Sequence, residues 1–481
     1  MPSKKSHVQK TAGTARKAPE SLHTLSHITA YQDDVSRVIH SNFFRRLEGK
    51  SQLFPAGESD FFRNRLTHSL EVACIGKIIA GKLSRQIPLE VVELAGLCHD
   101  IGHPPFGHQG EKALFKLMKK DGGFEGNAQT MRLVARLEKL VMRGNSLYGV
   151  DKKSDKRYGL NLTARSLASV LKYDKAIPQK NKKFNKGYYK SEKGLIDWVK
   201  LNVTEGKRYR GTFKTIECSI MDVADDIAYS TFDLMDALHA GFIRISDLMS
   251  GGSGVSTMDR VAGEVTKTLK REKRLGKNEK IGREKVLDVI TGLLSPFLAS
   301  QGVKIKFNVD MSESLKYKSL RNFLRENERI AKNGYQRSDL ARYLVKRFVE
   351  GVEIDKDNKK IPALSTVRLN DDTLREVECL KKFVYVTITS KSRVQVTEYR
   401  AQHIIGTIFE ALTKSENVEG MLPDDSAYIF QKLGKNKSTK KVSSSQKRAV
   451  CDFIAGMTDR YALEFYGRLQ SQDPETIFKP I

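Results

Sequence analysis

The sequence lacks the features that mark membrane proteins and disulfide-rich proteins. Its 481 residues contain no run of about 18 apolar residues, which excludes a transmembrane helix. Residues 1–20 are basic and polar, so we expect no secretory signal there but a disordered basic tail over residues 1–28. The five cysteines are widely spaced and form no CxxC pair. This pattern argues against a disulfide framework or a zinc knuckle and favours reduced thiols in the cytoplasm.

Acidic residues are scarce relative to basic ones. The chain has 57 Asp and Glu against 84 Lys and Arg, a net charge of +27. Such an excess favours phosphate-rich partners, either nucleotides or nucleic acid. The lysine-rich runs at 152–156, 180–193 and 435–441 lie in stretches rich in Gly, Asn and Ser, which is typical of surface loops. The charge therefore leaves contact with single-stranded nucleic acid open without assigning it.

Apolar residues recur every three to four positions along most of the chain, which is the spacing of amphipathic helices. The pattern predicts a helix over residues 71–83 and a second helix that begins after Pro88 and runs toward His99. Gly102 and the prolines that follow it are expected to end that helix, and another helix is expected to begin near Glu111. We therefore predict an all-α fold, a helical bundle with minor β content.

The predicted domain organisation has three parts. The basic tail is followed by a core over residues 29–250, which carries a poorly patterned, variable insertion at about 144–212. A mostly helical C-terminal region, residues 251–481, begins at a glycine-rich stretch. Helices and β-like patches of this region are expected at 257–275, 282–300, 303–309, 352–368, 372–389, 396–414 and 445–470.

The segment LCHDIGHPPFGHQGE, residues 97–111, carries the clearest chemical signal. It combines three histidines with an aspartate and a glutamate, and glycines and prolines interrupt it. Adjacent imidazole and carboxylate groups such as His99 and Asp100 are ligands for divalent metals. His68, just before the helix predicted over residues 71–83, is a candidate for a further ligand. The sequence therefore predicts a metal-centred active site.

The segment MDVADDIAYSTFD, residues 221–233, is a predicted helix with many aspartates on an otherwise apolar pattern. Asp225, Tyr229 and Asp233 are spaced i, i+4 and i+8, so they share one face. Buried carboxylates are costly unless a cation or a donor receives them, and a metal held by two His and two Asp meets that demand. We expect Asp225 to be the fourth ligand, with Asp226 as the alternative.

Several runs of the sequence resemble the deoxyguanosinetriphosphate triphosphohydrolase (dGTPase) family of HD-domain metal phosphohydrolases. The ligand order of that superfamily, H…HD…D, corresponds here to His68, His99, Asp100 and Asp225. The resemblance spans residues 30–250 and returns near the C-terminus. The runs that carry it are FFRRLEGKSQLFP (43–55), RLTHSLEV (65–72), HDIGHPPFGHQGE (99–111), FEGNAQTMR (124–132), ADDIAYSTFDLMDA (224–237) and CDFIAGMTDRYAL (451–463).

The resemblance implies hydrolysis of dGTP to deoxyguanosine and tripolyphosphate, with one divalent metal ion, Mg²⁺ or Mn²⁺, in each active site. It implies that His108 is the catalytic acid or base, that Glu111 orients it, and that His103 lies against the phosphates. The alternative for His108 and Glu111 is a loop contact with a helix-capping acid.

The resemblance also implies a set of substrate-binding residues. Arg65 would neutralise phosphate charge, and Tyr229 and Asp233 would face the sugar, where the tyrosine ring would exclude a ribose hydroxyl. Gln52 would contact the sugar or the base edge, and Asn127 is a weaker candidate. The structural alternatives are a surface arginine, a core tyrosine and polar residues that bond to the backbone of turns. The phosphate-binding cations Lys207, Arg208, Arg210 and Lys214 cannot be ranked from the sequence.

Three functions remain open at this point. The first is a dGTP triphosphohydrolase or a broader dNTP triphosphohydrolase. The second is an HD-domain nucleotidase or phosphodiesterase, and the third is a single-stranded nucleic-acid binder. Family members assemble as homo-oligomers, often hexamers, so the resemblance implies an oligomer and makes single-stranded DNA an expected partner, whereas no membrane partner is expected.

Overall fold

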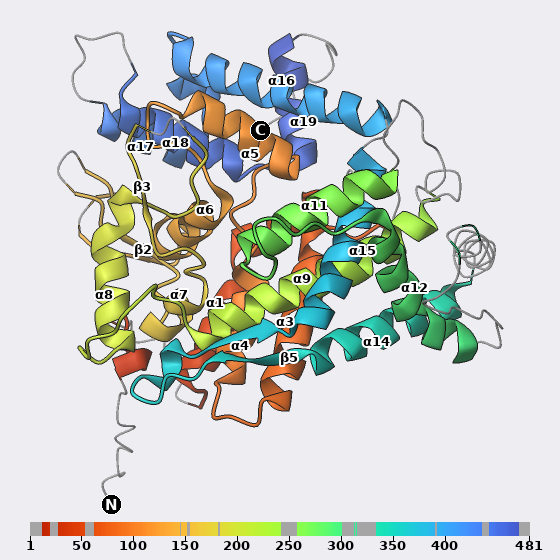
Figure 1. The fold of residues 1–481 in the computed structure, drawn as a ribbon. Coiled ribbons are helices and arrows are strands. Elements are labelled where there is room, and N and C mark those ends of the chain that lie inside the picture. Colours follow the sequence, from red (N-terminus) through yellow and green to blue (C-terminus); the bar gives the residue numbers. More distant parts are fainter. Residues whose placement is uncertain are drawn as a thin grey trace, which may run out of the picture. The chain divides into compact units, whose positions relative to one another are not determined.

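The structure is a computed structural model of the chain (Figure 1). The residues that it describes are 12–19, 27–52, 62–144, 146–151, 154–180, 183–241, 257–300, 312, 314, 333–389, 392–434 and 442–470.

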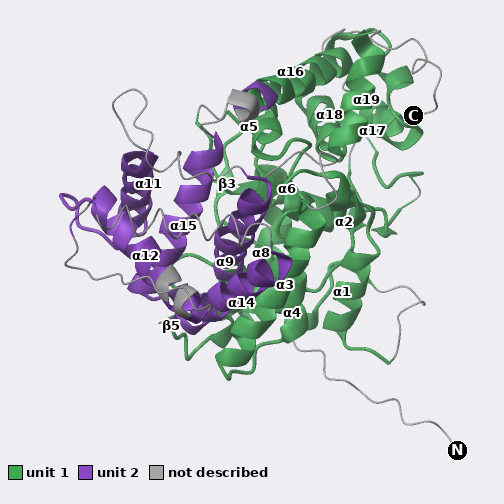
Figure 2. Cartoon of the chain, turned by 90° about the vertical axis from the view of Figure 1, so that its right-hand side faces the viewer, with its two compact units in different colours: residues 1–221, 355–366, 398–481 green, residues 222–354, 367–397 purple. Residues whose placement is uncertain are grey.

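The chain divides into two compact units (Figure 2). Unit 1 comprises residues 1–221, 355–366 and 398–481, and unit 2 comprises residues 222–354 and 367–397. Two helices, α9 (Ile216–His239) and α16 (Ser392–Lys414), contain residues of both units. The boundary predicted at the glycine-rich stretch 251–254 lies outside the described residues.

Unit 1 is built mainly from helices, in agreement with the predicted all-α class. Besides the residues of α9 and α16, its helices are α1 (Ala30–Ile39), α2 (Asn42–Arg46), α3 (Arg65–Lys82), α4 (Leu89–Cys98), α5 (Gly107–Leu117), α6 (Gly126–Arg132), α7 (Ala164–Ser169), α8 (Lys193–Val203), α17 (Asp424–Leu433), α18 (Ser444–Ala455) and α19 (Asp459–Gln470). The single helix predicted over 445–470 is thus divided into α18 and α19. No described helix combines the length and the apolar character needed to cross a membrane.

Unit 2 is also helical, and α11, α12 and α15 pack against one another. Apart from the residues of α9 and α16, its helices are α11 (Thr257–Arg271), α12 (Arg283–Ser300), α14 (Gly334–Glu350) and α15 (Asp371–Thr389). The bounds of α11, α12 and α15 agree with the predicted helices to within four residues, whereas no helix was predicted over α14. The β-like patch predicted at 303–309 lies outside the described residues.

The described strands form small two-stranded sheets, which is the minor β content that we predicted. In unit 1, β1 (Val141–Met142) pairs antiparallel with β2 (Arg157–Gly159), and β3 (Ala176–Ile177) pairs parallel with β4 (Tyr188–Tyr189). The third pair is β5 (Val352–Lys356) with β6 (Thr366–Leu369).

The segment predicted as a variable insertion at 144–212 contributes to the main hydrophobic core of unit 1. Leu160, Leu167 and Ile196 from this segment lie in one buried cluster with Leu97 and Met131 of the flanking helices. Helices α7 and α8 are short, so each contains only a few apolar residues. Their helical periodicity is therefore difficult to recognise among the many Lys, Gly and Asn residues of the segment. Burial of these side chains ties the segment to the rest of unit 1.

The helix ends near the predicted active site differ from the sequence-based bounds. Helix α3 begins at Arg65, six residues before the predicted start, because the Asn64 side chain accepts a hydrogen bond from the Thr67 amide and caps it. Helix α4 follows Pro88 as predicted but ends at Cys98. Helix α5 begins at Gly107, four residues before the predicted start at Glu111.

Helices α3 and α4 pack closely, and a glycine permits the close approach. A Cβ atom added at Gly96 of α4 would lie 2.5 Å from Cα and 2.6 Å from N of Ala73 on α3. His68 lies five residues before Ala73, and His99 lies three residues after Gly96. The contact between the two helices therefore sets the separation of two predicted metal ligands.

We expect Gly96→Ala to destabilise the protein by about 1–3 kcal/mol, because the added methyl group meets the backbone of α3 and not a movable side chain. Urea unfolding followed by circular dichroism measures the change. Gly263→Ala is the matched control, since Gly263 lies within α11 and an added Cβ there meets nothing within 4 Å. The control is expected to stabilise the protein by about 0.5–1 kcal/mol through helix propensity. Equal effects of the two substitutions would contradict the close-contact argument.

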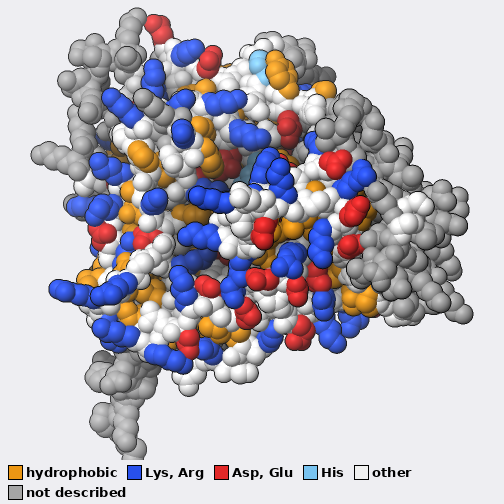
Figure 3. All heavy atoms as spheres, in the orientation of Figure 1, with side chains coloured by type: hydrophobic (Ala, Val, Ile, Leu, Met, Phe, Trp, Pro, Cys, Tyr) orange, Lys and Arg blue, Asp and Glu red, His pale blue; other side chains and the backbone are white. Residues whose placement is uncertain are grey.

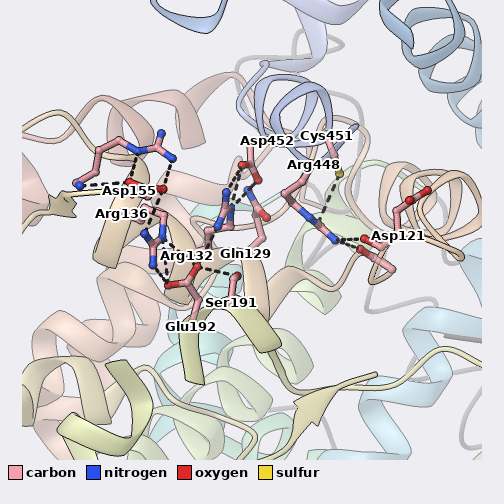
Figure 4. Close-up of polar contacts among 12 residues, drawn as sticks. Asp121, Gln129, Arg132, Arg136, Asp155, Ser191, Glu192, Arg448, Cys451 and Asp452 are labelled. Atoms are coloured by element: carbon pink, nitrogen blue, oxygen red, sulfur yellow. Dashed lines mark hydrogen bonds and ion pairs between the residues drawn. The ribbon is translucent and has the colours of Figure 1, made fainter. Parts of the chain in front are cut away.

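A network of buried charges joins α6 to α18 (Figure 4). Arg132, at the end of α6, donates to the Asp452 carboxylate of α18 with Nε to Oδ2 at 2.9 Å, and to Glu192 with Nη1 to Oε1 at 2.9 Å. Gln129 also donates to Asp452. Burial of the Arg132 guanidinium is costly, but the two carboxylates compensate for it and keep its pKa above the usual value. Helix α6 is therefore anchored at its C-terminal end.

Candidate active site

Three of the predicted metal ligands lie together in unit 1. His68 of α3, His99 at the end of α4 and Asp100 are all buried, and each offers a donor atom within 4.8 Å of the others. The His68 and His99 rings are in edge contact, with their centroids 5.2 Å apart. Two imidazoles and a carboxylate at this spacing are a donor set that suits a divalent cation.

The orientation of His99 follows from its backbone contact. Its Nδ1 lies 2.7 Å from the Gly96 carbonyl oxygen, which can only accept, so Nδ1 carries the proton. In the neutral ring the other nitrogen, Nε2, has the lone pair, and it lies 3.5 Å from Oδ1 of Asp100. A lone pair and a carboxylate that face each other repel, and either a proton on Nε2 or a metal cation coordinated by both groups removes this repulsion. The tautomer of His99 therefore fits a metal ligand.

Arg65 fixes the Asp100 carboxylate. Its Nη1 donates to Oδ2 of Asp100, and both side chains are almost fully buried. Burial acts to raise the pKa of Asp100, but His103, His99 and Arg65 together hold that pKa well below its usual range. The guanidinium that we predicted to face phosphate thus contacts a predicted metal ligand in this structure, and its contact with phosphate stays a prediction.

His108 and Glu111 form the pair that the sequence suggested. Nδ1 of His108 lies 3.2 Å from Oε2 of Glu111, and the other carboxylate oxygen, Oε1, accepts a hydrogen bond of 2.8 Å from the Gly126 amide at the start of α6. Burial acts to raise the pKa of Glu111, but its hydrogen bond to His108 and the charges of His103 and His108 lower it to about 2. Glu111 is therefore an ionised acceptor at neutral pH.

His103 contacts both Asp100 of the His68, His99 and Asp100 cluster and His108 of the His108–Glu111 pair. Its Nδ1 is 3.0 Å from Oδ1 of Asp100, and its ring centroid is 5.4 Å from that of His108. Burial, together with the nearby Arg65 charge, lowers the pKa of His103 below its usual value. His103, His108 and Glu111 also have donor atoms within 4.8 Å of one another. The imidazoles and carboxylates of residues 99–111 thus form one continuous polar site.

Helix α6 packs against the backbone of residues 99–102 and fixes it. The Thr130 hydroxyl accepts from the Gly102 amide at 3.0 Å and donates to the His99 carbonyl oxygen at 3.3 Å. A Cβ atom at Gly102 would lie 2.1 Å from the Gly126 carbonyl oxygen, so only glycine fits between the loop and α6. These contacts fix the backbone between the predicted metal ligands His99 and Asp100 and the His103 side chain.

Two predicted substrate-binding residues have different surroundings. Gln52 follows Ser51, which forms a β-bridge with Asn64 just before α3, and its Oε1 atom is buried with no hydrogen-bond partner among the described residues. The Asn127 side chain donates to the Glu125 carboxylate at 2.7 Å, which is the local contact of a polar residue at a helix start.

The remaining predicted residues lie on the part of α9 that belongs to unit 2. Asp225, Tyr229 and Asp233 share one helix without interruption, as their predicted common face requires. Asp226 accepts a hydrogen bond of 2.6 Å from Nζ of Lys381 on α15, so its carboxylate already has a cationic partner. This pairing favours Asp225 over Asp226 as the fourth ligand, which stays a prediction.

Sequence reasoning did not single out two buried residues next to the site. Nζ of Lys50, which is completely buried, donates to the carbonyl oxygens of His103 and Ala455 at 2.6 and 2.9 Å. Burial and the nearby Arg65 charge lower the pKa of Lys50 to about 7. Asp459, the first residue of α19, accepts from the amides of Ser51 and Phe106. Both residues lie in runs that resemble the dGTPase family, and membership of these runs was the available signal.

The surface charge is not concentrated in one stripe on the face drawn in Figure 3. Lys and Arg side chains are numerous over that face, and acidic side chains lie among them. Many of the described basic residues also form ion pairs, such as Lys193 with Asp197 and Arg347 with Glu376.

Comparison with known proteins places this site in a family. The model of the HD domain matches residues 65–230, and the model of the phosphohydrolase-associated domain matches residues 367–468. A deoxyguanosinetriphosphate triphosphohydrolase-like protein 2 of Mesorhizobium japonicum is 41% identical over 468 residues, which cover 93% of this chain and 94% of the relative. Deoxyguanosinetriphosphate triphosphohydrolase-like proteins of Shewanella loihica and Shewanella sediminis are each 30% identical, with coverage of 95% and 92% of this chain and 96% and 92% of theirs.

The matches cover the residues that build the site. His68, His99, Asp100, His108 and Glu111 lie within the HD match, and Asp459 lies within the phosphohydrolase-associated match. HD domains bind divalent metals, and the His and Asp donors described above are arranged for such an ion. The chain belongs to the deoxyguanosinetriphosphate triphosphohydrolase-like family of HD-domain phosphohydrolases.

Proposed function

We propose that this protein hydrolyses dGTP to deoxyguanosine and tripolyphosphate with the help of a divalent cation. The bond between the α-phosphorus and the 5′ oxygen breaks, the oxygen of water is added to the phosphorus, and the 5′ oxygen leaves with a proton. The observation that supports this most is the buried His68, His99 and Asp100 cluster beside the His108–Glu111 pair, in a chain of the dGTPase-like family.

The residues of the site suit a metal ion. His68, His99 and Asp100 would hold it, with Asp225 as the proposed fourth ligand, and Mg²⁺ or Mn²⁺ is the cation that we propose. When bound, such a cation polarises a phosphate oxygen and lowers the pKa of coordinated water. Arg65 keeps the Asp100 carboxylate oriented toward the cluster.

His108 is the proposed proton carrier. Because Glu111 is ionised and accepts at Nδ1 of His108, that nitrogen carries the proton, and Nε2 is the basic atom. The His108 side chain is 72% exposed, so a substrate can reach it. Nε2 can take a proton from the attacking water and return it to the departing 5′ oxygen. His103 would lie against the phosphates, next to His108.

We propose that deoxynucleotide recognition uses Tyr229 and Asp233 at the sugar and Gln52 at the sugar or base edge. The buried Oε1 atom of Gln52 supports this role, because an unsatisfied acceptor gains a hydrogen bond when a donor of the substrate binds. Arg65 is a proposed phosphate contact and Asn127 a weaker substrate contact. A tyrosine ring under C2′ would exclude the ribose hydroxyl.

The experiment is a panel of the four dNTPs and four rNTPs with Mg²⁺ or Mn²⁺, with the products separated by ion-exchange chromatography. We expect dGTP to give deoxyguanosine and tripolyphosphate in equal amounts, and the corresponding rNTP to react at least about 10-fold more slowly. Equal turnover of all dNTPs would indicate the broader dNTP triphosphohydrolase. Absence of tripolyphosphate from all eight reactions would contradict the proposal. Turnover of a nucleoside monophosphate or a phosphodiester in parallel reactions would then indicate the nucleotidase or phosphodiesterase function.

We also propose that the protein forms a homo-oligomer, with a hexamer as the expectation from the family, and that it binds single-stranded DNA. The net charge of +27 supports the second point, and steep weakening of DNA binding with added salt would be its signature. A cytoplasmic location is the proposal that fits the five widely spaced cysteines, which form no CxxC pair.

A further inference from the structure

The start of α19 contacts the loop that carries His103 and His108. Asp459 is buried, with 5% of its surface exposed. Its Oδ1 atom accepts from the Phe106 amide at 2.8 Å, and its Oδ2 atom accepts from the Ser51 amide at 3.0 Å and from the Ser51 hydroxyl. One carboxylate thus joins α19, the strand-like segment before α3 and the loop before α5.

Lys50 makes further hydrogen bonds between the segment before α3, the loop that carries His103 and the C-terminal helices. Its ammonium group donates to the carbonyl oxygen of His103, on the loop, and to that of Ala455, at the end of α18. The hydrogen bonds of Lys50, Ser51 and Asp459 therefore join three segments that are more than 50 residues apart in the sequence. These segments are residues 50–51, 103–106 and 455–459. Charge-assisted hydrogen bonds of this kind are stronger than bonds between neutral groups.

The loop is held in a conformation that its own residues do not favour. Phe106 has φ of +62°, in the left-handed region, and lies between His103 and His108. This region costs a residue other than glycine about 1–2 kcal/mol. The hydrogen bond from the Phe106 amide to Asp459 compensates for part of that cost, so loss of the carboxylate releases the loop toward other backbone conformations.

We propose that Asp459 is a positioning residue for His108, and that it acts by fixing the loop of residues 103–108. The inference depends on the proposed role of His108 in hydrolysis. It gives the C-terminal pair α18–α19 a part in the reaction without contact to the substrate. The proposed metal ligand His99 is oriented by its own contact with the Gly96 carbonyl oxygen, so loss of Asp459 is expected to change proton transfer more than metal binding.

The test compares Asp459→Ala with Asp121→Asn in the full-length protein. Asp121 also bonds to α18, since its side chain accepts from Nζ of Lys447 at 3.0 Å and its carbonyl oxygen accepts from Arg448 (Figure 4 shows the second contact), and no described contact joins its side chain to the loop. For Asp459→Ala we expect kcat with dGTP to fall about 10–100-fold while KM changes less than about 3-fold. Mn²⁺ bound per chain, measured by mass spectrometry of the metal, is expected to stay at the wild-type value. Asp121→Asn is expected to keep kcat.

Hydrogen exchange provides a readout that does not depend on activity. The peptide that contains residues 103–108 is expected to exchange faster in Asp459→Ala than in the wild type or in Asp121→Asn. If Asp459→Ala does not fold, Asp459→Asn, which keeps the side-chain volume and one acceptor oxygen, is the second variant, and an intermediate fall in kcat is expected. Wild-type exchange in this peptide, or equal losses of kcat in Asp459→Ala and Asp121→Asn, would overturn the inference. A wild-type protein without dGTP hydrolysis would overturn the proposed function, whereas the exchange comparison would still test the contact.

Discussion

Replacement of His99 by alanine is expected to abolish metal binding and dGTP hydrolysis together. His99 is one of three buried donors within 4.8 Å of one another, and its Nδ1 contact with Gly96 directs Nε2 toward Asp100. Loss of His99 leaves one imidazole and the proposed carboxylates of Asp100 and Asp225, which are too few to retain the cation through desalting. We expect activity to fall by about 10³-fold or more, since a bound cation supplies several kcal/mol of transition-state stabilisation.

The metal content and the activity should be measured on the same preparations. Wild-type protein reconstituted with Mn²⁺ and passed over a desalting column is expected to retain one equivalent per chain, and His99→Ala to retain none. His403→Ala is the matched control, because His403 lies on the exposed side of α16, where its ring contacts Tyr466. The control is expected to keep both the metal and the activity. Full turnover by His99→Ala would show that the metal ligands are assigned wrongly.

The central part of the site could be predicted because its residues are close in the sequence. His99, Asp100, His103, His108 and Glu111 lie within 13 consecutive residues. Short glycine- and proline-rich loops leave few ways to arrange such residues, and the contact that the family resemblance implied between His108 and Glu111 joins residues only three positions apart. The amphipathic periodicity of the helices predicted the fold class in the same way, because helical contacts are local.

Contacts between distant segments could not be predicted from the sequence. Nothing local in the sequence indicates that Asp459 bonds to residues about 350 and 400 positions away, or that Lys50 is buried. The start of α5 was misplaced for a related reason. Phe106 adopts a positive φ angle against its own preference, and the amide contact with Asp459 accompanies this conformation.

Arg65 illustrates a further limit. Its position three residues before His68 suggested a phosphate contact, and a basic residue near a phosphate site is a reasonable expectation. The structure shows its guanidinium on Asp100, under a loop in which a Cβ atom at Gly107 would lie 2.8 Å from its Nη2 atom, and the phosphate contact stays a prediction. The spacing along α3 fixes the direction of the side chain, whereas its partner is fixed by the packing of the neighbouring loop.

His108→Ala is expected to lower kcat by about 10²–10⁴-fold without loss of the bound metal, as for the removal of a general acid–base group. Glu111→Gln should have a smaller effect, a fall of about 10–100-fold, because the imidazole remains but loses the acceptor that fixes its tautomer. The two effects differ because Glu111, with a pKa of about 2, is ionised at neutral pH and cannot itself donate the proton to the leaving oxygen.

The metal content of His108→Ala also distinguishes an acid–base role of His108 from a role of His108 as a metal ligand. His103, His108 and Glu111 are spaced closely enough to hold an ion of their own. If they do so, His108→Ala will lose metal as well as activity, and the wild type will bind more than one equivalent. Gln109→Ala, on the same turn of α5 as His108, is the control that keeps both. A larger loss of kcat in Glu111→Gln than in His108→Ala would contradict the assignment of His108 as the proton carrier, since an orienting residue acts only through the residue that it orients.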